Sequence, residues 1–144
     1  MRLNKEKGIT MVALMITVVV MLLLIGVVVH FGNEAVEIAR LEDIKTDMIT
    51  IRTKAKIIAE QYNFKDIENL VGGPITDAEA DKLGIEKSED IRKLSSEDLK
   101  NQGLDTIDGD TYVVDYSLED TSICEVYYLQ GYQGMYSLTQ LQGL

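Results

Sequence analysis

The sequence predicts an α+β protein in which one long N-terminal helix spans a membrane with its first half and packs with its second half on a small antiparallel sheet. Three observations predict this fold. An uncharged apolar run extends from Ile9 to Val29. A stretch with one apolar face follows, without proline or glycine between Asn33 and Tyr62. The remaining residues, 63–144, have the pattern of short capped helices, turns and short strands.

The apolar run has the length of a membrane-spanning helix. At about 1.5 Å per residue it measures roughly 31 Å, close to the thickness of the hydrocarbon core. Arg2, Lys5 and Lys7 precede the run, and cations beside such a helix stay on the cytoplasmic side. A cleaved secretory signal fits less well, because its apolar region is only about 7–15 residues long and ends at a small-x-small cleavage site. The sequence therefore predicts a single-pass protein with a cytoplasmic N-terminus and an extracellular head.

Composition argues against several other classes of function. The formal net charge of −10 argues against phosphate-mediated binding of nucleic acid by this chain. Cys124 is the only cysteine, so no disulfide forms within the chain, and it has no second thiol or nearby histidine in sequence to form a catalytic pair. No phosphate-binding glycine motif is present. We therefore expect a protein that is not an enzyme and carries no cofactor.

The boundary of the apolar run carries a motif. Lys7-Gly8-Ile9-Thr10, followed by an apolar helix, resembles the N-terminus of type IV pilins and pseudopilins. The resemblance implies a leader of residues 1–8 that a prepilin peptidase removes after Gly8, leaving Ile9 as a new N-terminus open to methylation. A glycine suits this position because it lets an extended backbone approach a catalytic site closely.

The same resemblance implies a structural subunit of a surface filament, in which residues 9–29 associate with other subunits. Residues expected to form the assembly helix are Met11, Ala13, Leu14, Val18 and Leu22. Ala13 departs from the family, which normally has a glutamate as the fifth mature residue. Alanine there resembles a divergent branch from Gram-positive anaerobes and favours a minor or atypical subunit. The alternative is an uncleaved single-pass anchor that carries an extracellular binding head.

The segment of residues 30–62 continues the helix as an amphipathic stretch. Its apolar side chains recur with alternating spacings of three and four, at Leu41, Ile44, Met48, Ile51, Ala55, Ile58 and Tyr62. Such a stripe needs a partner surface, for which a sheet in the same chain is the simplest choice and a coiled coil with another chain is the rival.

Residues 63–144 are expected to form the small head. Thr76 and Ser95 each open a short helix with an acidic residue three positions later, and Gly84 and Gly103 close them. Residues 71–74 are expected to form a turn after the helical region. Two segments, 111–116 and 125–129, read as strands, while 135–141 is open between a third strand and a helix.

Two clusters in the head suggest sites. Asp105, Asp108 and Asp110 could supply oxygen ligands to calcium. Asp108-Gly109 is also an ordinary turn before a strand, and this interpretation is preferred. Six of the seven tyrosines lie in residues 112–136, and such a cluster could bind glycans or partner proteins. The preferred interpretation is that tyrosine suits half-exposed strands. Cys124 is expected to face the core.

Overall fold

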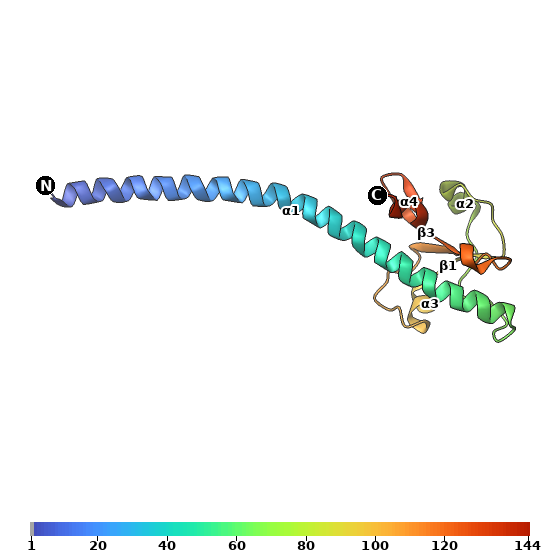
Figure 1. Ribbon diagram of the computed structural model, residues 1–144. Helices are drawn as coiled ribbons and strands as arrows, with labels where there is room; N and C mark the ends of the chain where they lie inside the picture. Colours follow the sequence, from blue (N-terminus) through green and yellow to red (C-terminus); the bar gives the residue numbers. More distant parts are fainter. Residues whose placement is uncertain (1) are drawn as a thin grey trace. The chain divides into compact units, whose positions relative to one another are not determined.

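The computed structural model describes the backbone of residues 2–144 and all side chains in it except those of residues 2–9, 29–31 and 33. Figure 1 shows the order of the elements. Two compact units make up the chain, Met1–Arg40 and Leu41–Leu144. The elements are α1 (Arg2–Asn63), α2 (Asp77–Leu83), β1 (Ile91–Lys93), α3 (Ser96–Asn101), β2 (Tyr112–Asp115), a 3₁₀ turn η1 (Thr121–Ile123), β3 (Glu125–Tyr132), β4 (Met135–Ser137) and α4 (Leu138–Gln142). The predicted α+β class is confirmed at this level.

Helix α1 runs without interruption from Arg2 to Asn63. It begins before Ile9, where the mature helix was expected to start, and ends one residue beyond the predicted Tyr62. The apolar stripe is confirmed, since its five central members are buried and both of its end residues are partly buried. Ala59, which lies outside the stripe pattern, is buried in the same cluster. Burying an aliphatic side chain of this size contributes about 1.5–3 kcal/mol each. The stripe therefore finds its partner within the same chain.

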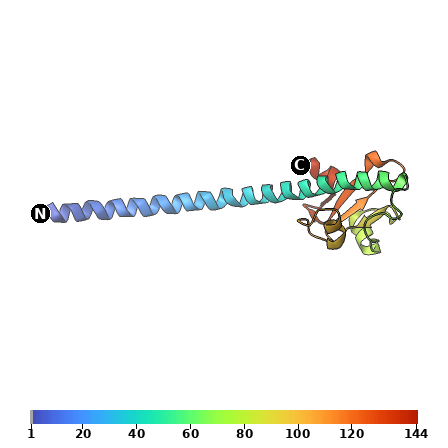
Figure 2. The same ribbon diagram turned by 90° about the horizontal axis from the view of Figure 1, so that it is seen from below.

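The sheet has four antiparallel strands in the order β1-β2-β3-β4. Successive residues of β2 point to opposite faces, as the period of two in a strand requires. Tyr112 and Val114 join the cluster beneath α1, while Val113 joins a second cluster with Ile91 and Leu129. Both faces of the sheet are consequently covered, with α1 over one and α2 supplying Ala80 to the other. Figure 2 shows α1 crossing the sheet within the Leu41–Leu144 unit.

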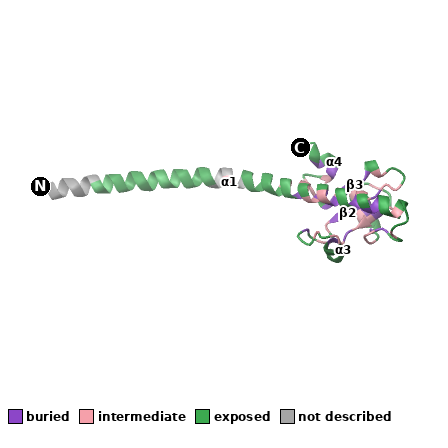
Figure 3. Ribbon diagram, turned by 60° about the horizontal axis from the view of Figure 1, so that its bottom comes forward, coloured by how far each residue is buried: buried purple, intermediate pink, exposed green. Residues whose placement is uncertain are grey.

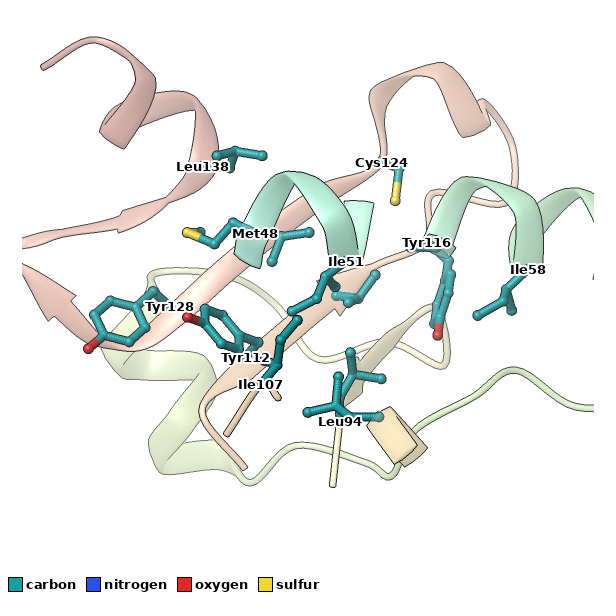
Figure 4. Close-up of a cluster of buried hydrophobic side chains, with 14 of the residues drawn as sticks. Met48, Ile51, Ile58, Leu94, Ile107, Tyr112, Tyr116, Cys124, Tyr128 and Leu138 are labelled. Atoms are coloured by element: carbon teal, nitrogen blue, oxygen red, sulfur yellow. The ribbon is translucent and has the colours of Figure 1, made fainter. Parts of the chain in front are cut away.

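The main cluster is formed by side chains from distant parts of the chain. Figure 4 shows Met48, Ile51 and Ile58 of α1 directed toward the aromatic and aliphatic side chains below them. Leu138 and Leu141 of α4 close the same cluster. Figure 3 shows the buried residues gathered between α1 and strands β2 and β3.

The predicted helix caps are confirmed. Thr76 and Ser95 each form a reciprocal capping box, with Glu79 and Asp98 respectively, at the starts of α2 and α3. Gly84 caps α2 in the left-handed conformation, with a φ of 68°. The undecided segment 135–141 contains both predicted structures, because β4 is followed directly by α4 with Ser137 as its N-cap.

Strand β1 was not predicted from the sequence. It consists of Ile91, Arg92 and Lys93 and pairs with β2 from Asp115 to Val113. On its other edge Lys93 exchanges two backbone hydrogen bonds with Gly73, of 2.8 and 2.9 Å. The glycine-rich turn at residues 71–74 thus adds an isolated bridge to the sheet, well after α1 has ended at Asn63.

The interpretation of the tyrosines as half-exposed strand residues is wrong for half of the cluster. Tyr112, Tyr116 and Tyr128 are buried in the main core. Each hydroxyl still finds an acceptor, in the Asp47 carboxylate at 3.4 Å, the Val71 carbonyl at 2.6 Å and the Gln130 side chain at 2.9 Å. Burial of tyrosine is tolerated here because the polar end of the ring is satisfied.

Candidate functional site

The first candidate site is the apolar part of α1. Among the described residues, one helix is long and apolar enough to cross a membrane, over Thr10–Val28, and none of this stretch is buried. Its side chains include Met11, Leu14 and Leu22, all more than half exposed. A helix of this length measures roughly 28 Å, about the thickness of the hydrocarbon core. The observation is consistent with a single-pass anchor, and an N-terminal signal sequence passes the same test.

The five residues expected in the assembly helix fall on two sides of α1. Met11, Leu14, Val18 and Leu22 follow spacings of three and four, so they share one face. Ala13 lies on the opposite side with Thr17, whose hydroxyl donates to the Ala13 carbonyl at 2.8 Å. This bond satisfies the threonine hydroxyl within the helix, so the polar group imposes little cost in an apolar surrounding. The small Ala13 and the large aliphatic residues therefore present two different surfaces.

The expected processing site lies at the start of the same helix. The backbone of Gly8 and Ile9 belongs to α1. The side chains of Arg2, Lys5, Lys7 and Ile9 are not among those that the structure describes. The bond after Gly8 is thus found in helical rather than extended backbone.

The aspartates before β2 form a turn. The Asp110 amide donates to the Leu94 carbonyl at 2.8 Å, and the Thr111 hydroxyl donates to the Gly109 carbonyl at 3.2 Å. Gly109 lies so close to Ser96 that a Cβ atom there would clash with the Ser96 backbone. The structure places the expected turn at Gly109 and Asp110, shortly before β2.

Calcium binding finds no support in this geometry. No group of three or more histidine, cysteine, aspartate or glutamate side chains in the described part of the chain is placed to hold a metal ion, so Asp105, Asp108 and Asp110 are not brought together as a ligand set. Calcium requires about six to eight oxygen ligands. Whether the loop binds calcium in solution stays a prediction.

Cys124 faces the core as expected. It is buried between η1 and β3. Burial is the main cause that raises the pKa of its thiol to about 11, and the carboxylate of Asp115 adds to this. A thiol held in its protonated form is a poor nucleophile, so Cys124 acts as a small apolar side chain.

One polar arrangement was not foreseen from the sequence. Asp47 of α1 accepts a hydrogen bond from Tyr112 of β2, at 3.4 Å. Burial, followed by the nearby charges of Asp43 and Asp108, raises the pKa of the Asp47 carboxyl. Asp43 and Asp47 are four residues apart on α1, and that spacing places them on one side of the helix. No signal in the sequence indicates that Asp108 lies near Asp47, because only the fold brings the two carboxylates close together.

Comparison with known proteins gives no assignment. No protein-family model matches this chain, and neither a curated protein nor a solved structure matches it.

Proposed function

We propose that this chain is a prepilin-like structural subunit of a type IV pilus or pseudopilus-type surface filament, such as one used in secretion. The observation that carries the proposal is the division of a single helix. The stretch Thr10–Val28 of α1 is apolar and none of it is buried, while the stripe residues from Ile44 to Ile58 are buried against a small antiparallel sheet. The first part requires lipid or other apolar helices, and the second requires the head.

The leader motif supplies the second support for this function. Lys7-Gly8-Ile9-Thr10 stands directly before the apolar stretch, where the cations hold the N-terminus in the cytoplasm. A membrane peptidase would cut after Gly8 from that side, and Ile9 would become the N-terminus that is methylated. Since the bond lies in the first turns of α1, cleavage requires those turns to open, and helix ends open at little cost in free energy.

Assembly would then use the exposed face of α1. Met11, Leu14, Val18 and Leu22 offer a continuous aliphatic surface. Helices in lipid associate through close van der Waals packing, without the need for polar groups. The Ala13 side is narrower and would allow the closest approach of two helices, as small residues do in membrane helix pairs.

The decisive experiment measures the intact mass of the protein extracted from its native membranes. A chain that begins at Ile9, with or without one added methyl group, supports the proposal. Replacement of Gly8 by leucine should then leave the uncut precursor in the membrane, because a side chain prevents the close approach of the backbone to the peptidase. The matched control is Gly26→Leu, which alters a glycine inside the apolar stretch with nothing within 4 Å of its added Cβ and should be processed normally.

The competing function predicts a different mass. An uncleaved anchor with an extracellular binding head would begin at Met1 or Arg2 in cells with an active prepilin peptidase. That result would overturn the filament subunit as proposed.

A further inference from the structure

The C-terminal part of the head carries no charged side chain. Residues 126–144 contain no acidic or basic residue, although 26% of the whole chain is Asp, Glu, Lys or Arg. This stretch forms almost all of β3 and the whole of β4 and α4, and α4 packs beside the hairpin that the two strands form (Figure 1). Charged residues stand at its border, where Lys82 lies 6.0 Å from the centre of the Tyr136 ring and Glu125 accepts a hydrogen bond from Thr139. An uncharged area with a charged rim is a candidate for contact with another molecule.

Five side chains on these adjoining elements define what we call the uncharged surface. Gln130, Gln133 and Gln142 are exposed. Tyr132 and Met135 are paired across the hairpin and are half-buried where they pack against the main core. A lack of charge together with tyrosine and methionine is typical of the centre of a protein–protein interface. The composition of the uncharged surface therefore favours a protein as its partner.

The three glutamines of the uncharged surface keep hydrogen-bonding groups for a partner. The Gln130 side-chain oxygen accepts a hydrogen bond from the Tyr128 hydroxyl at 2.9 Å, and its amide N–H groups have no partner among the described residues. In the same part of the chain, the side chains of Gln133 and Gln142 form no hydrogen bond. A glutamine amide both donates and accepts hydrogen bonds. Two identical amides can therefore bind each other.

Gln133 is held at the tip of the hairpin in an unfavourable backbone conformation. Its φ is 51° and that of Gly134 is 77°, so both residues of the two-residue loop lie in the left-handed region. Glycine, asparagine and aspartate are the usual residues in such a loop, because they adopt this region at the least cost. Glutamine has no such advantage. The fold thus accepts strain at the position that carries an exposed amide, and strained residues gather at functional sites.

We propose that the uncharged surface binds the same surface of a second copy of this chain, so that a two-fold axis relates the two copies. Each copy has a formal net charge of −10, so two copies repel each other, and the repulsion is weakest where neither presents a charge. An uncharged surface needs no opposite charge on its partner, and its glutamine amides can pair with those of an identical surface. The contact belongs to the Leu41–Leu144 unit alone and does not depend on processing after Gly8.

Cross-linking of the full chain in mild detergent, through one introduced cysteine, tests the contact. Cys124 is buried and the pKa of its thiol is raised to about 11, so it reacts slowly and the original chain gives the background yield. Gln130→Cys and Gln142→Cys each place a thiol on the uncharged surface. With a short bismaleimide, at least one of them should form covalent dimers in several-fold greater yield than Asn101→Cys, which alters an exposed position of α3.

Charges introduced at Gln133 make the test specific. In the cysteine variant with the higher yield, Gln133→Glu and Gln133→Lys should each lower the dimer yield several-fold, because like charges then meet across the two-fold axis. The lysine variant lowers the net negative charge of the chain, so stronger general repulsion cannot explain its loss. An equal mixture of the two variants should recover most of the yield as mixed dimers, which mass spectrometry recognises. Asn101→Glu and Asn101→Lys are the matched controls and should leave the yield unchanged.

Four outcomes would overturn the contact. The first is a background yield from both cysteine positions, which is expected if the surface takes a neutral glycan or another protein. The others are charge variants that behave as their controls, a loss in the glutamate variant alone, and a mixture that recovers nothing although each variant unfolds at the temperature of the original chain. The mass of the chain from its native membranes separates this inference from the proposed function. A start at Ile9 with background yields rejects only the contact, whereas dimers of a chain that starts at Met1 reject only the processing.

Discussion

Tyr116 shows how a single polar atom is accommodated in the core. Its ring is 1% exposed, and its hydroxyl donates to the Val71 carbonyl at 2.6 Å. Tyr116→Phe keeps the ring and removes this bond, so we expect a loss of about 1 kcal/mol in the free energy of unfolding. Chemical unfolding of the full chain in mild detergent measures the loss. Tyr132→Phe is the matched control, because no hydrogen bond of its hydroxyl is found among the described residues; equal losses in the two variants would contradict the prediction.

The Tyr116 hydroxyl is well accommodated in the core, but the ionised carboxylate of Asp47 is unfavourable in the folded chain. Burial, then Asp43 and Asp108, raise the pKa of its carboxyl, so the folded state holds the proton more tightly than the unfolded state does. Above the folded pKa, the ionised Asp47 carboxylate therefore lowers the free energy of unfolding. This loss is relieved as the pH falls through the folded pKa and the carboxyl takes up its proton. Asp47→Asn should stabilise the chain at pH 7 by at most about 0.5 kcal/mol, since solvent screens a half-exposed group. The gain should vanish in acid.

Asp120 provides a control of opposite sign for this prediction. Hydrogen bonds from the hydroxyl and the backbone amide of Ser122 lower the pKa of its carboxyl. The stability that it contributes is present above the pKa of the unfolded state and is lost as the pH falls through the folded pKa. Asp120→Asn should therefore weaken the chain at neutral pH or leave it unchanged. Thermal unfolding between pH 3 and pH 8 measures the midpoint temperature of each variant relative to the original chain. A shift of both midpoints in the same direction at neutral pH would contradict the interpretation.

At the scale of elements, the turn that joins β1 depends on glycine. Gly72 has a φ of 117°, and a Cβ atom there would stand 2.6 Å from the Cβ of Arg92 and 3.1 Å from the Lys93 carbonyl oxygen. Gly72→Ala should cost more than the roughly 1 kcal/mol typical of a strained glycine site, because conformation and contact both oppose it. Gly84→Ala is the matched control, with a φ of 68° and open space around the added atom. Equal losses of unfolding free energy in Gly72→Ala and Gly84→Ala would show that the close contact with β1 adds no cost of its own, which would contradict the prediction.

Elements encoded by local periodicity could be predicted from the sequence, and those created by long-range pairing could not. The stripe of α1 and the boxes at Thr76 and Ser95 depend on residues within one turn of each other. Strand β1 is three residues long, two of them cations, and it is extended because Val113–Asp115 and Gly73 hold it. Its propensity alone gives no such signal.

The same division applies to the candidate sites. The apolar stretch is continuous in sequence, so it could be located before the fold was known, whereas the processing site after Gly8 stays a prediction. The cluster of Asp43, Asp47 and Asp108 is different, because Asp108 is about sixty positions from Asp47 and reaches it only through the fold. Burial of Tyr112 likewise follows from its face of β2, which the alternation of the strand left undecided.

For the whole molecule, stability is concentrated in one of the two compact units. Every buried residue of the main core, from Ile44 to Leu141, belongs to Leu41–Leu144. A fragment of residues 41–144 should therefore fold without lipid and unfold cooperatively, close to the midpoint of the full chain in detergent. A fragment of residues 64–144 keeps the whole sheet but loses the α1 side chains that cover one face of it, among them Met48, Ile51 and Ile58. Exposure of that face should leave the shorter fragment unfolded or aggregated.

Circular dichroism and the dispersion of amide resonances distinguish the two fragments. The longer one should show resolved resonances and a single thermal transition. If the shorter fragment were equally ordered, the sheet would fold without the apolar stripe of α1, which would contradict the prediction. If the longer fragment were disordered, the apolar stretch before Leu41 would have to contribute to folding of the head, although none of its residues Thr10–Val28 is buried. The expected result makes the helix one element with two separate parts, since its second half completes a core that folds in water and the stretch Thr10–Val28, long and apolar enough to cross a membrane, takes no part in that core.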